Sequence, residues 1–480
     1  MSVVKNYIYS VLSGVLLTII PIITIPYIAR VLGKEYTGIH SFTFSIVQYF
    51  VMFGLMGTLT YGNRAIAYVR DDLKKRSKVF WEIFYLNFSL VFLTTIAYFI
   101  AVFALFDYNL RKYYIIQSIN LFAAAVDITW FFYGMEEFKK TISRNMIIRI
   151  TGAVLIFIFV KDSTHIWRYS VIIASSSLLG NLTLWMYVPK VIILQSIVPK
   201  KVLCHFIPSF KLFIPRIAVQ VYTLLDKVML GIMSTKAIVG IYELTTNITK
   251  MPLPLITSLG TVVMPRISFL FANNDHNKIK DYLNKTFKFQ TYISLLLYFG
   301  ITGVSFEFVP WYFGKGYELS VPLMCILSVT IIGISWSNVI GAQMMIPMQK
   351  EKEYTISLFI GAGINFLINL LLIPRYNAIG AAIGTAIAEL VVAVSQLIFV
   401  RKILNIKELF KDIWKCFISG IAMLAIIRSI GLFSYSSILT TIIQISLGTI
   451  VYILILILLK SETNELLICS IHKMLKKKIK

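Results

Sequence analysis

Two neighbouring apolar segments of this chain carry cationic and polar residues at helical spacing. Within 212–235, four such residues are separated by four, three and four positions and therefore share one helix face: Arg216, Gln220, Thr223 and Lys227. The next segment, 247–271, holds Lys250 and Arg266. Few acids are available nearby to pair with these cations. Asp226 adjoins Lys227 in sequence, but adjacent residues on a helix point about 100° apart. Excess positive charge inside a membrane favours an anionic ligand, such as a phosphate or diphosphate.

Amide and hydroxyl side chains recur at similar spacing in other apolar segments. Gln48 follows Ser41 and Ser45 on one helix face, and Asn365 lies one turn before Asn369. Amides suit sugar hydroxyls, whereas Ser and Thr in membrane helices more often form hydrogen bonds between helices. The cation Arg30 lies at a segment end, where its side chain could equally extend toward the interface. The predicted substrate site contains Arg30, Arg216, Lys227, Arg266, Lys250, Gln48, Gln220 and Asn365.

Three acids inside apolar segments are the candidates for binding a proton or sodium ion, and structural ion pairing explains them equally well. These are Asp127, Asp226 and Glu389. The four cysteines lie far apart, without C-x-x-C or histidine pairing, so we expect no metal site and no disulfide. No G-x-x-x-x-G-K-[ST] motif is present, so we expect no ATPase activity and no cofactor.

The elements that must position these residues are long apolar helices. About 20 apolar residues cross a bilayer, and fourteen segments approach or exceed that length, of which 146–160 is the weakest. The segments are 7–29, 38–62, 79–106, 113–133, 146–160, 169–188, 212–235, 247–271, 289–313, 320–347, 355–373, 379–400, 414–432 and 438–459. We therefore predict an all-α polytopic membrane protein with 14 transmembrane helices.

The basic residues alternate between the gaps. Of 46 Lys and Arg, 31 lie at the termini and in every second gap, including Lys139 to Arg149 between the fourth and fifth segments. Eight lie in the gaps between. The positive-inside rule then places both termini in the cytoplasm of a cell-membrane protein. Seven basic residues remain within or at the ends of apolar segments: Arg30, Arg216, Lys227, Lys250, Arg266, Lys415 and Arg428.

Composition excludes other classes. A hydrophobic share of 58% does not suit a soluble globular protein. The net charge of +24 is spread over short loops, which topology and anionic lipid explain without nucleic acid. The gaps are too short for an extramembrane domain.

A weak internal repeat divides the chain. Arg30-Val-Leu-Gly33 and Gly38-Ile-His40 in the first half correspond to Lys227-Val-Met-Leu-Gly231 and Gly240-Ile-Tyr242 in the second. Six segments separate the copies, so both halves enter the membrane in the same sense, with a substrate site expected between them. We predict an N-lobe over 1–205, a C-lobe over 206–405, and an additional helix pair with a basic tail over 406–480.

Several motifs together resemble the polysaccharide repeat-unit flippases of the Wzx type, which are oligosaccharidyl-lipid exporters of the MATE-like MOP superfamily. They are Pro21-Ile-Ile-Thr-Ile-Pro26-Tyr-Ile-Ala-Arg30-Val-Leu-Gly33, Asp127-Ile-Thr-Trp130-Phe-Phe-Tyr-Gly134, Asp226-Lys227-Val-Met-Leu-Gly231, Met264-Pro-Arg266-Ile267, Pro347-Met-Gln-Lys350 and Gly380-Ala-Ala-Ile-Gly384-Thr385. The resemblance implies two six-helix lobes in a V plus two C-terminal helices. It also implies that Arg30, Lys227 and Arg266, which lie inside these motifs, bind a diphosphate.

The implied function is transfer of undecaprenyl-diphosphate-linked oligosaccharides from the cytoplasmic to the outer leaflet, for capsule, exopolysaccharide or O-antigen assembly. Alternating access driven by an ion gradient is expected, without enzymatic chemistry, and polysaccharide polymerase and assembly proteins are possible partners. The main alternative is a MATE-type multidrug or cation antiporter, whose cavity should be acidic. A glycosyl polymerase would need a large external loop, and a scaffold subunit would not need polar helix faces.

Overall fold

The computed structural model describes residues 19–195, 198–461 and 464, and every regular element among them is a helix. Twelve of these helices are long and apolar enough to cross a membrane. A shorter apolar helix, Ile19–Val31, precedes them, so the first predicted segment lies partly outside the described residues. The chain is therefore an all-helical polytopic membrane protein, as its hydropathy predicted.

The number of spans is where pattern and structure are hardest to compare. The predicted segments 355–373 and 379–400 form the two arms of α17 (Glu351–Val400), whose backbone is non-helical at Asn377, where φ is 50°, and Gly384 of the second arm packs against Asn369 of the first. The predicted eighth segment falls on α12 (Lys236–Thr249) and α13 (Leu253–Ala272), and Pro252 lies between them. A total of fourteen transmembrane helices stays a prediction.

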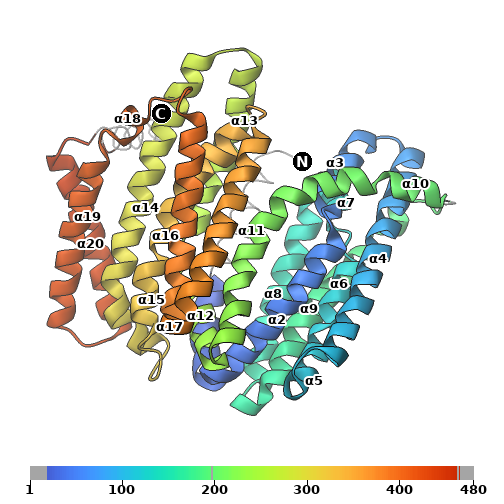
Figure 1. The fold of residues 1–480 in the computed structure, drawn as a ribbon, viewed down its shortest axis with the longest axis horizontal. Helices are drawn as coiled ribbons and strands as arrows, with labels where there is room; N and C mark the ends of the chain where they lie inside the picture. The colour runs from blue at the N-terminus through green and yellow to red at the C-terminus, as the bar shows by residue number, and fades with distance from the viewer. Residues whose placement is uncertain (1–18, 196–197, 462–463, 465–480) are drawn as a thin grey trace, which may run out of the picture. The chain divides into compact units, whose positions relative to one another are not determined.

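Contacts divide the chain into two compact units, which we call unit 1 (residues 1–243) and unit 2 (residues 244–480). Unit 1 contains α2 (Gly33–Leu55), α3 (Thr58–Val69), α4 (Leu73–Ala104), α5 (Arg111–Gln117), α6 (Ile119–Ala125), α7 (Thr129–Gly134), α8 (Phe138–Phe159), α9 (Ile166–Trp185), α10 (Pro199–Cys204) and α11 (Phe206–Met233). Within it, α3, α7 and α10 lie at one end and α5 at the other (Figure 1). The predicted lobe boundaries at 205 and 405 stay predictions.

The core of unit 1 is aromatic where α3, α4 and α7 meet. Phe80, Trp130, Phe131 and Phe132 are almost fully buried there. A ring edge of Phe131 meets Phe80, with 5.1 Å between the ring centroids, which is a favoured geometry for aromatic pairs. This packing holds the short helix α7 against the long helix α4.

The two repeated glycines contact each other's segments inside unit 1. A Cβ atom on Gly38 would overlap the Lys236 carbonyl group, and one on Gly240 would overlap the Lys34 carbonyl group. The same Cβ on Gly38 would lie 2.9 Å from the Gly240 backbone nitrogen. Small residues allow membrane helices to approach this closely. The repeat seen in the sequence thus corresponds to a reciprocal backbone contact between the start of α2 and the start of α12.

Unit 2 contains α13, α14 (His276–Tyr312), α15 (Ser320–Leu327), α16 (Val329–Ser337), a π-helix (Asn338–Met345), α17, α18 (Ile406–Phe410), α19 (Ile413–Leu432) and α20 (Ile438–Leu458). Figure 1 shows α19 and α20 beside α14, and a cluster including Phe299, Met423, Ile427 and Tyr452 fills their interface. The last two predicted helices therefore form a pair that packs on α14.

Candidate functional site

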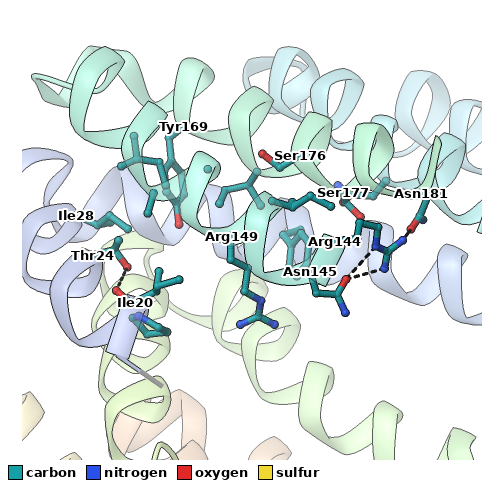
Figure 2. Close-up of a pocket in the computed structure, with 18 of the residues that line it drawn as sticks. Ile20, Thr24, Ile28, Arg144, Asn145, Arg149, Tyr169, Ser176, Ser177 and Asn181 are labelled. Carbon is teal, nitrogen blue, oxygen red and sulfur yellow. Dashed lines mark hydrogen bonds between the residues drawn. The ribbon is translucent and has the colours of Figure 1, made fainter. Parts of the chain in front are cut away.

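A cavity of about 510 Å³ lies within unit 1, between Ile19–Val31, α2, α6, α8 and α9 (Figure 2). Its volume is in the usual range for small-molecule sites, which is about 300–1,000 Å³. The polar residues that line it are Thr24, Gln48, Asn120, Arg144, Asn145, Arg149, Tyr169, Ser176, Ser177 and Asn181. No acidic residue lines this cavity among the described residues. The cavity is therefore rich in amides and hydroxyls, and it is cationic.

Arg144 is held in place by neutral groups. Its guanidinium donates to the Asn145 amide oxygen at 2.6 Å, to the Asn181 amide oxygen at 2.9 Å and to the Gly180 carbonyl oxygen at 3.2 Å. Asn181 in turn donates to the Ala123 carbonyl oxygen at 2.7 Å, which connects α9 to α6. These bonds fix the position of Arg144 without neutralising its charge.

Asp127 is near enough to Arg144 to interact with it electrostatically. Its carboxylate is occupied locally, however, because it accepts hydrogen bonds from the Thr129 amide at 2.8 Å and the Thr129 hydroxyl at 2.6 Å. Asp127 thus forms an Asx-type turn with Thr129, the first residue of α7.

Arg149 lies on the same helix, α8, and its side chain is less constrained than that of Arg144. Its side chain is exposed, and none of the described residues forms a hydrogen bond or ion pair with its guanidinium. Figure 2 shows this guanidinium pointing away from the Arg144 cluster, with no hydrogen bond drawn to it. A guanidinium with free donors in a cavity can bind an oxyanion through two parallel hydrogen bonds.

Of the residues predicted for the substrate site, Gln48 is the one that lines this cavity. Arg216 and Gln220 lie on an exposed face of α11, and Arg30 is exposed at the end of Ile19–Val31. Lys227 forms an ion pair with Glu243, and only 16% and 20% of the two side chains are exposed. The expectation that Lys227 has few acidic partners was therefore wrong, because α12 brings Glu243 against α11.

The remaining predicted cations and Asn365 lie in unit 2. Lys250 lies at the break between α12 and α13, and Arg266 is exposed on α13, with its guanidinium 5.5 Å from the Phe269 ring centroid. Asn365 is fully buried in α17, where its amide oxygen accepts from Asn369 at 3.2 Å.

Asp226 and Glu389, the other two ion-coupling candidates, are buried in different units. Asp226 in α11 accepts a hydrogen bond from the Tyr242 hydroxyl at 2.8 Å. Glu389 is buried in α17, where its backbone lies close to Gly333 of α16.

The two cavity arginines were missed because both were counted with the basic residues of a cytoplasmic gap. The predicted fifth segment, 146–160, began after Arg144 and already contained Arg149, whereas α8 begins at Phe138 and includes both. Arginine and asparagine lower the hydropathy of its first half. Helical spacing was the available signal, since Thr141, Asn145, Arg149, Gly152 and Ile156 recur every three or four residues.

An all-helical polytopic protein with a cationic, amide-lined cavity has the features of a membrane transporter for an anionic solute. The chain belongs to the family described as polysaccharide biosynthesis protein, whose model matches residues 3–271. A second model, described as Lipid II flippase MurJ, matches residues 153–457. The family resemblance of the sequence motifs is thereby confirmed.

Individual relatives agree with this assignment. A protein of Escherichia coli (strain K12) named "Putative O-antigen transporter" is 26% identical over 80% of this chain and 93% of its own length. A protein of Haloferax volcanii named "Probable low-salt glycan biosynthesis flippase Agl15" is 23% identical over 49% of this chain and 50% of its own length.

Solved structures show the same fold. The inward closed conformation of Lipid II flippase MurJ matches with a TM-score of 0.77 at 16% identity, covering 94% of this chain and 98% of that one. An inward-facing multidrug resistance MATE family transporter of the MOP superfamily matches with a TM-score of 0.56 at 14% identity, covering 82% and 99%.

Proposed function

We propose that this protein is a flippase for lipid-linked oligosaccharides. It moves a short oligosaccharide on undecaprenyl diphosphate from the cytoplasmic to the outer leaflet of the cell membrane, for capsule, exopolysaccharide or O-antigen assembly. The observation that carries the proposal is the cavity of unit 1, whose two arginines face amides and hydroxyls, with no acid among the described residues that line it. The family, and the transport and flippase functions named for its relatives, support the same substrate class.

Different residues of the cavity bind different parts of the substrate's head group. Arg149 binds a diphosphate oxygen pair, and Arg144, fixed by Asn145 and Asn181, contributes a second positive charge. Gln48 and Asn120 are suited to sugar hydroxyls, because an amide both donates and accepts. A polyprenyl tail does not fit into about 510 Å³ and remains in the bilayer. The protein thus transports its substrate and changes no covalent bond.

Transport requires further residues and a source of energy. We propose alternating access driven by a proton or sodium gradient. Asp127, Asp226 or Glu389 binds the coupling ion. The cations Arg30, Arg216, Lys227, Lys250 and Arg266, with Gln220 and Asn365, then contact the head group at other stages. The same proposal includes two six-helix lobes, a C-terminal helix pair and cytoplasmic termini. It also includes partnership with a polymerase and assembly proteins.

The alternative is a multidrug or organic-cation antiporter, which the MATE-like fold favours. The charge of the cavity separates the two functions, because two arginines repel an organic cation and attract an anion.

Reconstitution tests the proposal directly. Proteoliposomes containing the protein should expose a fluorescent undecaprenyl-diphosphate oligosaccharide to an impermeant quencher faster than protein-free vesicles do. Inorganic pyrophosphate should inhibit this movement, and an organic cation such as ethidium should not. Ethidium transport without movement of the lipid-linked sugar would establish the antiporter instead.

A further inference from the structure

Asn120 of α6 lines the cavity of unit 1 with the oxygen of its side-chain amide. Its Nδ2 atom donates to the Gln117 backbone carbonyl oxygen at 3.1 Å and to the Gln117 Oε1 atom at 2.9 Å, so both of its N–H groups are used. Asn120 is only 8% exposed, and it forms part of the cavity wall. Its Oδ1 atom has no hydrogen-bond partner among the described residues. The amide therefore offers the cavity an acceptor and no donor.

Gln117 fixes which end of the Asn120 amide faces the cavity. A backbone carbonyl oxygen can only accept, so the Asn120 atom that lies 3.1 Å from it must be the nitrogen. Gln117 is itself 1% exposed, and its Nε2 atom lies 3.3 Å from Nδ1 of His40. Reversing the Gln117 amide would place two NH₂ groups against each other. The orientation of Asn120 is therefore set by a buried protein partner, before any ligand binds.

The α8 side of the cavity has the opposite hydrogen-bond polarity. The Asn145 Oδ1 atom accepts from Arg144 Nε at 3.2 Å and from Arg144 Nη2 at 2.6 Å, so the amide nitrogen is the end left for a ligand. Figure 2 shows this oxygen turned toward the Arg144 guanidinium. Arg149 adds a guanidinium that none of the described residues binds. Donors on α8 suit phosphate oxygens, whereas the Asn120 oxygen on α6 repels them and suits a donor.

A third helix holds these two sides at a set distance. Asn181 of α9 accepts from Arg144 of α8 at 2.9 Å and donates to the Ala123 carbonyl oxygen of α6 at 2.7 Å. Ala123 lies less than one helical turn after Asn120. The cation and the acceptor are thus connected through one buried asparagine. A site of this kind can hold a phosphate at one end and select for a hydrogen-bond donor at a fixed distance from it.

We propose that Asn120 is a specificity-determining residue, whose Oδ1 atom accepts a hydrogen bond from one hydroxyl or amide N–H group of the sugar. The inference rests on the proposed function, since it requires the diphosphate of a lipid-linked sugar to lie against α8. The head group then has its phosphates toward α8 and its sugar toward α6. A sugar without that donor leaves the buried oxygen unpaired, which weakens binding. Gln117 is a positioning residue, because it orients Asn120 and does not line the cavity.

Binding of short-chain carrier analogues would test the inference. The full-length protein in detergent would be titrated calorimetrically with citronellyl diphosphate and with its glucose, galactose and N-acetylglucosamine derivatives. The derivative that binds most tightly would then be compared with analogues in which a single hydroxyl or acetamido group is replaced by hydrogen. For the wild type, we expect one analogue to bind about tenfold more weakly than its parent, because it has lost the hydrogen bond to Asn120.

Asn120→Leu should abolish this selectivity. The parent compound should bind the variant about tenfold more weakly than it binds the wild type, and the analogue that lacks the donor should bind at least as tightly as before. Citronellyl diphosphate without a sugar should bind both proteins alike. Gln117→Leu should lower the selectivity in part, because the Asn120 amide is then free to rotate. A ratio of two dissociation constants does not depend on the fraction of active protein, so it separates specificity from loss of folding.

Asn87→Leu is the matched control. Asn87 is a fully buried asparagine that donates to the Ala124 carbonyl oxygen of α6 at 3.1 Å and accepts from the Thr58 hydroxyl at 2.9 Å, and it does not line the cavity. Its replacement should lower stability and leave the ratio unchanged.

Three results would overturn the inference while the proposed function stands. They are equal binding of every analogue to the wild type, sugar derivatives that bind no more tightly than citronellyl diphosphate, and a ratio that Asn120→Leu retains or that Asn87→Leu loses equally. If Asn120→Leu does not fold, an unchanged ratio in Gln117→Leu decides against the inference. Failure of every compound to bind, with the sugar-free diphosphate included, would instead overturn the proposed function, and the inference with it.

Discussion

Each unit contains a membrane-embedded arginine site, and the two sites differ in how the arginine charge is balanced. In unit 2, Arg428 of α19 donates to both carboxylate oxygens of Glu307 in α14, at 2.8 and 2.9 Å. Gln444 of α20 adds a hydrogen bond of 2.9 Å to the same carboxylate. In unit 1, Arg144 is bound by amides and a carbonyl group, and Arg149 by none of the described residues.

The difference separates a structural cation from a binding cation. The Glu307 carboxylate neutralises Arg428 and connects α14 to the α19 and α20 pair, so this site has no charge left for a ligand. Amides hold Arg144, which also interacts electrostatically with the nearby Asp127 carboxylate, whereas Arg149 retains its hydrogen-bond donors. A cation costs free energy inside a membrane, so one left without a counter-ion in a cavity is best explained by a ligand that supplies it.

The largest expected effect is on the paired site. Glu307→Gln should lower the free energy of unfolding by about 3 kcal/mol, because it leaves the Arg428 charge uncompensated among α14, α19 and α20. Thermal and denaturant unfolding of the purified protein would measure this loss. Glu307→Gln/Arg428→Gln should recover part of it. A single variant as stable as the wild type would mean that the ion pair does not hold the two C-terminal helices.

The free cation should behave in the opposite way. Arg149→Gln should weaken binding of the lipid-linked sugar by about 2 kcal/mol, roughly thirtyfold, because a charged hydrogen bond to phosphate is lost. The free energy of unfolding of Arg149→Gln should differ from that of the wild type by less than about 0.5 kcal/mol, since the Arg149 guanidinium has no partner among the described residues. The half-saturating substrate concentration in proteoliposomes measures the first effect, and Arg149→Lys should retain part of the affinity. A large loss of stability with unchanged affinity would reverse the assignment.

Arg144 should fall between these two cases. Arg144→Ala removes the hydrogen bonds to Asn145, Asn181 and Gly180, and should lower stability by about 1 kcal/mol while also reducing transport. Asn181→Ala should cost a similar amount, and the combined variant should cost less than the sum, because both changes break the same contact between α8 and α9. Strict additivity in a double-mutant cycle would show that the two residues act independently.

The smallest effects are expected at Lys227 and Glu243, where an ion pair coincides with a predicted substrate cation. Both side chains are partly exposed, so Lys227→Met or Glu243→Gln alone should lower stability by about 1 kcal/mol, and the double variant should restore most of it. Transport should fall further in Lys227→Met, because only that change removes a positive charge. Equal transport in the two single variants would group Lys227 with Arg428 as a structural cation.

Helix formation and membrane class were predictable from residue pattern. Long apolar segments can satisfy their backbone hydrogen bonds only as helices in lipid, so the fold class followed from composition and segment length. Helical spacing also predicted a shared polar face on α11, where Arg216, Gln220 and Thr223 are all exposed. It did not reveal which helix lies opposite, and Lys227 proved to pair with Glu243.

The sequence by itself determined that the chain is a multi-pass helical membrane protein, that it resembles the polysaccharide flippases, and which of its charges topology does not require. Tertiary structure decided which of those charges are neutralised. Arg428 meets Glu307 across 121 positions of sequence, and Arg144 meets Asn181 across 37, because helical periodicity fixes a residue's direction from its own axis and not its neighbour. The same limit hid the cavity: Arg149 was counted as a loop charge, and only the packing of α8 against α9 shows it lining a cavity beside amides, with no acid among the described lining residues.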